Sequence, residues 1–438
     1  MTDLGLQRVG LVPFLVSTNN TADAIAHLLQ ATNASHLLVG PVGNMSTLDG
    51  RVSAAIEMLN RSVDGTKREG KKISAIPWPS AEIFEKGEDL APRPLEAYDA
   101  KRVTVILHSS GTSSLYPKPI IWRQEMLRVC HQLPFYRNTD PFQLTAFLGH
   151  LPPFHAMSSV MFHNSIGSGY KLCFDAPSKL PRLTQPVALL ETMVRLKIDL
   201  PILPGALIEA SIKQPTLVQY LQSLRNVFYG GGPLSLDVAK ELYEHHGVKC
   251  TPFYGTTEVT AASSLLEELP DGEIKRGRWA SIQATPAIRY LWRPVQGETE
   301  GSEYREMLIA PKGKYYTPAV INTTYEGVEA YATGDKCKVY FDSTPERYEI
   351  HGRIDDGIVL SSGEKTNATP IVDIVKRNEL VRDAIMFGTG KPMNGILIEL
   401  EEAVDEYDGK DDTLAKLRSK VWPSVQEANA FAPTHSRT

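Results

Sequence analysis

The chain has 438 residues, with 46 Lys and Arg against 51 Asp and Glu, which gives a formal net charge of −5. This balance lacks the basic excess of proteins that bind nucleic acids or anionic membranes, so we expect neither partner. Apolar residues make up 42% and charged residues 22%, which excludes a disordered chain and favours roughly two or three folded units. The 4 cysteines form no CxxC pair, which argues against disulfides and cysteine zinc sites and for a reducing, cytoplasmic location.

The first hundred residues contain the pattern of a strand, a helix and a second strand. The apolar run at 9–16 predicts a buried strand, and the helix at 22–31 has a candidate cap at Asn20-Thr21. A further strand is predicted at 36–40, so this βαβ unit indicates a parallel sheet covered by helices. The polar stretch 61–100 is typical of a surface loop.

The middle of the chain continues this alternation and then changes character. A buried strand is predicted at 103–108, and another at 226–229 runs into Gly230, Gly231 and Gly232. Residues 285–350 predict short strands with frequent turns, as in a small barrel or meander. The tail predicts a separate α+β unit with a helix at 370–377, strands at 384–387 and 395–399, and a late helix.

One candidate site is the loop that follows the strand at 103–108. It reads His108-Ser-Ser-Gly-Thr-Ser-Ser-Leu-Tyr-Pro-Lys118. Its hydroxyls and backbone N–H groups can donate to phosphate oxygens, and the lysine adds positive charge. It is not a GxxxxGK[ST] phosphate loop, and the alternative interpretation is an ordinary surface turn.

Three further motifs could contribute to a nucleotide site. Gly230-Gly-Gly-Pro233 precedes Tyr254-Gly-Thr-Thr-Glu258, where glycines let a planar ligand approach and a carboxylate can hold Mg²⁺. Tyr331-Ala-Thr-Gly-Asp335 and Gly352-Arg-Ile-Asp-Asp-Gly357 follow later. An aspartate at a turn is commonly a turn former, but a carboxylate can also accept from both hydroxyls of a ribose.

The order of these motifs resembles the adenylate-forming superfamily, which includes acyl-CoA ligases, firefly-type luciferases and adenylation domains of nonribosomal peptide synthetases. The sequence segments HSSGT, PPFHAM, GRIDDGIVLSSGEK and EANAFAPTHSR are most similar to the adenylation domain of fungal synthetase-like carboxylic acid reductases. The resemblance covers nearly the whole chain. It implies an α/β adenylate-forming fold, with a large part at 1–353 of stacked α/β sheets and a small β-barrel, and a small α+β part at 354–438.

In that family ATP and a carboxylic acid give an acyl-adenylate and pyrophosphate, and the acyl group then passes to a thiol. The resemblance implies Mg²⁺ on Glu258, α-phosphate contact by Thr257, an acyl-pocket role for His155 and a hinge at Asp355. It implies a phosphate site at Ser109, Ser110, Gly111, Thr112, Ser113 and Lys118. It implies that Gly231, Gly232 and Tyr254 line the adenine pocket, that Asp335 and Arg353 hold the ribose, and that Gly255 and Thr256 also contact the nucleotide.

The substrate class can be narrowed by a missing charge. Relatives that activate amino acids usually carry an aspartate just after the Pro-Phe-His segment, where this chain has Ala156-Met-Ser-Ser-Val160. Burying an unpaired ammonium is costly. We therefore expect an aryl or alkyl carboxylic acid without an α-amino group, and a phosphopantetheinylated carrier domain as the acceptor.

The sequence departs from the family at three places. The loop Thr112–Lys118 lacks the family's second glycine and has one extra residue before Pro-Lys. The chain begins later than its relatives, and no Gly-Lys motif follows Ala432–Thr438, so we expect truncation at both ends and impaired adenylation. The alternatives are an acyl-CoA ligase and a chain that binds nucleotide or acyl groups without turnover.

Overall fold

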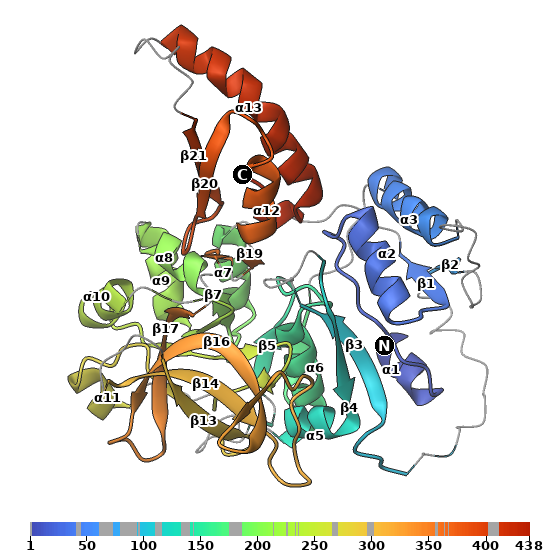
Figure 1. The fold of residues 1–438 in the computed structure, drawn as a ribbon. Coiled ribbons are helices and arrows are strands. Elements are labelled where there is room, and N and C mark those ends of the chain that lie inside the picture. The colour runs from blue at the N-terminus through green and yellow to red at the C-terminus, as the bar shows by residue number, and fades with distance from the viewer. Residues whose placement is uncertain are drawn as a thin grey trace.

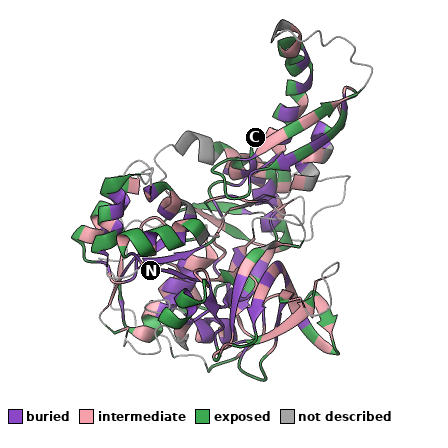
Figure 2. Ribbon diagram, turned by 90° about the vertical axis from the view of Figure 1, so that its left-hand side faces the viewer, coloured by how far each residue is buried: buried purple, intermediate pink, exposed green. Residues whose placement is uncertain are grey.

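The computed structural model describes residues 2–40, 45–60, 73–78, 94, 97–109, 116–132, 141–142, 144–174, 186–212, 214–224, 227–232, 234, 236–264, 270–295, 302–354, 358–362, 364–366, 368–401 and 411–438. In Figure 1 the N-terminal elements, the central sheets and the curled sheet formed by residues 282–353 lie together, and the C-terminal elements project from one end. Figure 2 shows buried residues gathered on the inner strands and exposed residues on the outer helices.

The N-terminal elements include the predicted helix and the predicted second strand. They are α1 (Thr2–Arg8), α2 (Ala22–Ala31), β1 (His36–Val39), α3 (Met45–Asn60) and β2 (Ser74–Pro77). Thr21 caps α2 by accepting from the Ala24 N–H, and Ala24 and Leu28 are buried. β1 pairs in parallel with β2, which lies in the stretch predicted to be loop, so that prediction is wrong at Ser74–Pro77.

The predicted buried strand at 9–16 is also wrong. The segment forms one bridge, between Phe14 and Ile106, and Val9, Leu11 and Val12 are 44%, 57% and 42% exposed. Pro13 provides no N–H, so only its carbonyl joins the pairing, by accepting from the Ile106 N–H at 2.9 Å. A short apolar run does not by itself specify a buried strand.

The central elements form a hairpin and parallel strands covered by helices. The hairpin pairs β3 (Val103–His108) with β4 (Pro119–Arg123), which confirms the strand predicted at 103–108. The parallel strands are β5 (Thr145–Phe147), β6 (Lys171–Cys173), β7 (Ile202–Pro204), β8 (Val227–Gly230) and β9 (Cys250–Pro252). The helices are α5 (Gln124–Gln132), α6 (Ala156–Ser168), α7 (Pro186–Arg195), α8 (Gly205–Ser211), α9 (Pro215–Ser223) and α10 (Leu236–His246).

The strands predicted at 285–350 form a curled antiparallel sheet, with strand order β12-β17-β16-β14-β13 and with β15 paired to β16. Its strands are β12 (Ile282–Gln283), β13 (Arg289–Pro294), β14 (Tyr304–Ala310), β15 (Thr323–Tyr325), β16 (Val328–Tyr340) and β17 (Arg347–Arg353). The short elements before it are β10 (Gly255–Thr256), β11 (Thr260–Ala261) and α11 (Asp271–Lys275). One buried cluster, which includes Trp122, Phe228 and Tyr348, joins this sheet to the central layers.

The C-terminal unit contains the predicted helices and strands around a core of its own. Its elements are β18 (Ile358–Val359), β19 (Lys365–Thr366), α12 (Ala368–Val375), β20 (Val381–Phe387), β21 (Gly395–Leu400), α13 (Asp411–Phe431) and the 3₁₀ turn η1 (Thr434–Ser436). Among the described helices, none combines the length and the apolar character needed to cross a membrane.

Candidate functional site

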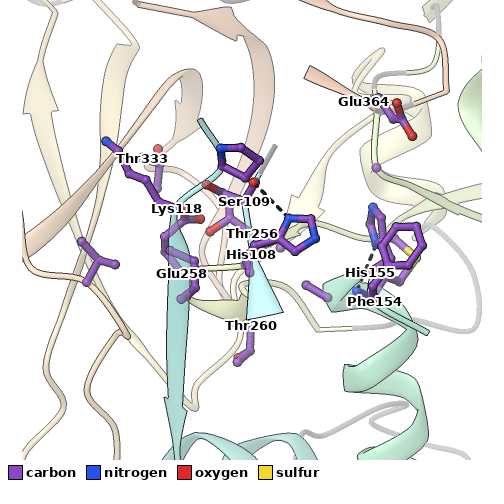
Figure 3. A pocket seen from close by; sticks show the side chains of 18 of the residues that line it. His108, Ser109, Lys118, Phe154, His155, Thr256, Glu258, Thr260, Thr333 and Glu364 are labelled. Carbon is purple, nitrogen blue, oxygen red and sulfur yellow. Dashed lines mark hydrogen bonds between the residues drawn. The ribbon is translucent and has the colours of Figure 1, made fainter. Parts of the chain in front are cut away.

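A cavity of about 460 Å³ lies where the central layers, the curled sheet and the C-terminal unit meet. Its walls include residues from β3, β4, α6, the β10–β11 hairpin, β16 and the segments around β19 and η1. Figure 3 shows Lys118, Ser109 and Glu258 on one side of this cavity, and His155, Phe154 and Glu364 on the other. Side chains far apart in the sequence therefore line one cavity.

Nine of the predicted site residues line this cavity: Ser109, Lys118, His155, Gly231, Gly255, Thr256, Thr257, Glu258 and Arg353. Three described ones, Gly232, Tyr254 and Asp335, are not among the lining residues. Ser110, Gly111, Thr112, Ser113 and Asp355 lie outside the described residues.

The candidate phosphate loop begins and ends on the two strands of a hairpin. His108 pairs with Pro119, and the Ser109 N–H donates to the Lys118 carbonyl at 3.0 Å. Both ends of the loop therefore lie at the cavity wall. A hydroxyl and an ammonium group at this edge suit an anionic ligand.

The Gly-Thr-Thr-Glu segment is a tight hairpin, in which Gly255 opposes Ala261 and Thr256 opposes Thr260. A Cβ at Gly255 would lie 2.2 Å from the Thr260 carbonyl oxygen, so only glycine fits there. The Thr257 carbonyl accepts from the Trp122 indole N–H at 2.7 Å, and the Glu258 carbonyl accepts from the Ala319 N–H at 2.8 Å. These bonds fix the backbone and leave the Glu258 side chain at the cavity.

Tyr254 and Asp335 lie behind the cavity wall and form a network with Arg353, which lines the cavity. The Tyr254 hydroxyl donates to Asp335, and Arg353 Nη1 lies 3.3 Å from the other carboxylate oxygen. Burial, followed by the charge of Asp335, raises the pKa of Tyr254 well above its usual value. Asp335 is 4% exposed, so in this structure its carboxylate faces Tyr254 and Arg353 rather than the open cavity.

Two partly buried histidines line the cavity. His155 is the N-cap of α6, because its Nδ1 accepts from the Met157 N–H at 3.3 Å. Burial lowers the pKa of His155, which the nearby Glu364 charge partly offsets. Burial also lowers the pKa of His108, whose ring stacks on Phe154. Both rings are therefore favoured in the neutral form.

Several residues of the cavity wall have no role predicted from the sequence motifs. They include Asn20, His108, Phe154, Glu306, Thr333, Glu364 and His435. His108 directly precedes the hydroxyl-rich loop, so its position was a usable signal. Glu364 and His435 meet only through the fold of the C-terminal unit, and no local pattern predicts that pairing.

The residues present are compatible with a nucleotide and with Mg²⁺. Thr256 Oγ1 is buried, lines the cavity and has no hydrogen-bond partner among the described residues, which leaves it to bond a ligand. The described part of the chain has no cluster of three or more His, Cys, Asp or Glu placed to hold a metal by itself. The single carboxylate of Glu258 is sufficient for Mg²⁺, because proteins often bind this ion through one carboxylate and the substrate's phosphates.

Comparison with known families agrees with this geometry. The sequence profile of the family described as AMP-binding enzyme matches residues 1–283, and that of the AMP-binding enzyme C-terminal domain matches residues 355–438. The adenylate-forming reductase Nps10 of Heterobasidion annosum is 28% identical over 442 residues, covering 99% of this chain and 38% of that protein. The carboxylic acid reductase of Neurospora crassa is 26% identical, over 99% of this chain and 39% of its own length.

Solved structures show the same fold. The A-PCP didomain of the carboxylic acid reductase from Segniliparus rugosus, in complex with AMP, aligns with a TM-score of 0.69. It is 15% identical, over 99% of this chain and 64% of that chain. The amide bond synthetase McbA from Marinactinospora thermotolerans aligns with a TM-score of 0.64 at 18% identity, over 95% of this chain and 80% of that one.

Proposed function

Because the chain belongs to the AMP-binding enzyme family and has the adenylate-forming fold, we propose that it activates a carboxylic acid with ATP. The product would be an acyl-adenylate, and the acid would be an aryl or alkyl acid without an α-amino group. The observation that carries this proposal is the single cavity that collects Ser109, Lys118, Thr256, Glu258 and Arg353. The resemblance to fungal carboxylic acid reductases expected from the motifs is confirmed by the relatives found.

The phosphates would lie at the edge formed by the β3–β4 and β10–β11 hairpins. Ser109 and Lys118 bring a hydroxyl and a positive charge, and the loop residues Ser110, Gly111, Thr112 and Ser113 belong to the same proposed site. Thr257, and the unpartnered hydroxyl of Thr256, would hold the α-phosphate. Positioning of the carboxylate against phosphorus and neutralisation of charge are the main sources of rate in such transfers.

Glu258 is the proposed ligand of Mg²⁺. The ion, when bound, neutralises phosphate charge and polarises phosphate oxygens. The Ala319 N–H donates to the Glu258 carbonyl, so the backbone that carries the carboxylate is fixed. The Tyr331 hydroxyl also interacts with Glu258, and burial followed by that negative charge raises the Tyr331 pKa. Tyr331 therefore remains a neutral donor that can orient the carboxylate.

The adenosine would lie against Gly231, Gly232, Tyr254 and Gly255. For the ribose we propose Asp335 and Arg353. Arg353 lines the cavity, and Asp335 would act mainly through its bonds to Tyr254 and Arg353. A buried, paired carboxylate of this kind orients its partners at small entropic cost.

The acyl group would lie along the start of α6, beside His155. The wall there consists of apolar side chains: Ile120, Ala156, Met157, Val160 and Phe253. Glu306 also lines the cavity, but its carboxylate accepts from Arg293 Nε at 2.7 Å. Glu364, whose charge reaches His155, is in contact with His435. An ammonium group at the apolar wall would therefore find no unengaged carboxylate among the described residues there, which supports an acid without an α-amino group.

A carrier thiol is the proposed acceptor of the acyl group. This chain spans 38% of the adenylate-forming reductase Nps10, and a structural neighbour is named an A-PCP didomain, so a carrier domain is a reasonable partner.

We propose that the chain divides into 1–353 and 354–438, with the hinge at Asp355. The 4 cysteines are free thiols, which fits the proposed cytoplasmic location.

Exchange of labelled pyrophosphate into ATP tests the activation step. The chain would be assayed with Mg²⁺ and with benzoic acid, a medium-chain fatty acid and a panel of amino acids. Exchange that depends on a non-amino acid supports the proposal, and exchange selective for an amino acid contradicts the substrate class. ATP binding without exchange favours a nucleotide-binding chain without turnover, and transfer to coenzyme A in place of a carrier favours an acyl-CoA ligase.

A further inference from the structure

Three imidazoles line the cavity, and their neighbours determine which ring nitrogen carries the proton. His108 Nε2 accepts from the Ser17 N–H at 2.9 Å, and its Nδ1 faces the Ser109 carbonyl at 3.3 Å. The Nδ1–H tautomer satisfies both contacts. Because both nitrogens of His108 are engaged with the backbone, this ring holds the Ser17 segment against the start of the phosphate loop.

His155 is the second imidazole. Its Nδ1 accepts the Met157 N–H, so the neutral ring carries its proton on Nε2 and can only donate from that atom. Protonation at Nδ1 would remove the cap of α6, and burial already lowers the pKa of the ring. His155 can therefore orient a substrate oxygen but is poorly suited to take up a proton.

His435 is the third imidazole, and its arrangement is the reverse. Its Nδ1 lies 2.5 Å from Glu364 Oε2, and both side chains line the cavity. The contact is an ion-pair contact and not a well-aligned hydrogen bond. The negative charge beside Nδ1 still favours the proton on that nitrogen, which places the lone pair of the neutral ring on Nε2. The side chains are 17% and 33% exposed, so the pair is partly buried yet accessible.

A buried polar cluster holds this pair in place. Thr366, two residues after Glu364, and Ser436, directly after His435, are 0% and 2% exposed, and their hydroxyl oxygens lie 2.9 Å apart. The Asn394 side-chain amide donates to Thr366 Oγ1 at 3.1 Å and to the His435 carbonyl at 3.2 Å. These side-chain bonds join the two segments that carry Glu364 and His435, which preorganises the pair.

We propose that His435 is the general base for the acyl-acceptor thiol and that Glu364 is its positioning residue. The inference rests on the proposed acyl-adenylate. The thiol sulfur forms a bond to the acyl carbon, and the bond from that carbon to the phosphate oxygen breaks with its electron pair on AMP. The thiol proton passes to His435 Nε2, and the Glu364 carboxylate stabilises the imidazolium at Nδ1.

The experiment separates transfer from activation by supplying synthetic benzoyl-adenylate to the full chain. Thioester formation and AMP release are measured with N-acetylcysteamine, an alkyl thiol, and with thiophenol, which is largely thiolate at neutral pH. The variants are His435→Gln and Glu364→Gln. The matched control is His351→Gln, which removes a ring whose Nε2 lies 3.4 Å from Glu349 and which is not among the cavity-lining residues.

With N-acetylcysteamine, we expect His435→Gln to lower transfer about 100-fold, the lower end of general-base effects, and Glu364→Gln to lower it about tenfold. With thiophenol, both losses should shrink to about threefold or less, because a thiolate needs no base. His351→Gln should transfer like the unaltered chain. This dependence on thiol acidity is not expected of a residue that only supports the fold.

Equal losses with both thiols, or no loss in either variant, would overturn the proposal. If the unaltered chain exchanges pyrophosphate but never transfers benzoyl to an alkyl thiol, activation stands and the inference fails. If it transfers from benzoyl-adenylate in a His435-dependent manner but exchanges no pyrophosphate, the inference stands and the activation step fails.

Discussion

The Tyr254 hydroxyl donates a hydrogen bond to the Asp335 carboxylate and so joins residues 81 positions apart in the chain. Tyr254 directly precedes the Gly-Thr-Thr-Glu hairpin, whereas Asp335 lies on β16 of the curled sheet. Arg353 on β17 approaches the other oxygen of the same carboxylate. The network therefore fixes the curled sheet against the hairpin that carries the proposed phosphate and metal ligands.

Tyr254→Phe should destabilise the chain by about 1–3 kcal/mol, because it leaves one oxygen of a buried carboxylate without its donor. The free energy of unfolding would be measured by urea denaturation. Tyr315→Phe is the matched control, since Tyr315 is 55% exposed and should change stability by less than about 0.5 kcal/mol. Equal effects of the two substitutions would show that the Tyr254–Asp335 bond adds no stability.

Gly255→Ala should impair both folding and pyrophosphate exchange. Its Cβ would lie 2.2 Å from the Thr260 carbonyl oxygen, so the backbone of the hairpin must shift. Overpacking of this kind costs about 1–3 kcal/mol. Gly272→Ala, where the added Cβ meets nothing within 4 Å, is the control and should be neutral or slightly stabilising. Thermal unfolding and exchange would be measured on both variants, and normal exchange by Gly255→Ala would contradict the close approach.

Stability should fall as the pH drops from about 6.5 toward 4, because of His163 on α6. Burial, with a smaller contribution from His131, lowers the pKa of His163 from 6.5 to about 4. The unfolded chain then binds more protons than the folded chain between these values, so acid favours unfolding by up to about 3 kcal/mol. Well above pH 6.5 the imidazole is neutral in both the folded and the unfolded chain, so His163 then causes no loss of stability.

The His163 prediction is checked by urea denaturation of His163→Gln at several pH values. This substitution should flatten the pH dependence in that window. His245→Gln, at an exposed position of α10, should leave the dependence unchanged. An unaltered slope in His163→Gln would show that other groups cause the acid sensitivity.

Glu258→Gln should lower Mg²⁺-dependent exchange by about 100- to 1,000-fold while the fold stays intact. Its main-chain carbonyl bond to Ala319 survives the substitution, so the effect reports on the carboxylate. Exchange would be measured across a Mg²⁺ titration, with Glu379→Gln at an exposed position as the control. A variant with normal Mg²⁺ dependence would remove Glu258 from the proposed metal site.

Local sequence patterns predicted the elements whose signals are contained within a few residues. The helix capped by Thr21, the strand at Val103–His108 and the helices and strands of the C-terminal unit agree with the structure. The exposed four-residue strand Ser74–Pro77 was missed because its residues show no apolar alternation. The run at 9–16 has strand composition but lies along one edge of β3 through a single bridge.

In the candidate site, too, local motifs could be predicted from the sequence and long-range contacts could not. Motifs beside strand ends, such as Gly255–Glu258, could be recognised because they occur in a characteristic order along the chain. Contacts between distant side chains were not, because periodicity says nothing about which loops meet. The burial of Asp335 behind Arg353 and the approach of His435 to Glu364 both depend on tertiary packing.

The bond from the Ser109 N–H to the Lys118 carbonyl makes the register of β3 and β4 independent of the length of the loop that joins them. The strands β3 and β4 keep their register whatever number of residues joins them, because the hairpin is closed at its last pair. Changing the loop length then costs only closure entropy, about 0.6 kcal/mol for each doubling. A change in the number of residues between Ser109 and Lys118 is therefore compatible with an unaltered pairing of β3 and β4.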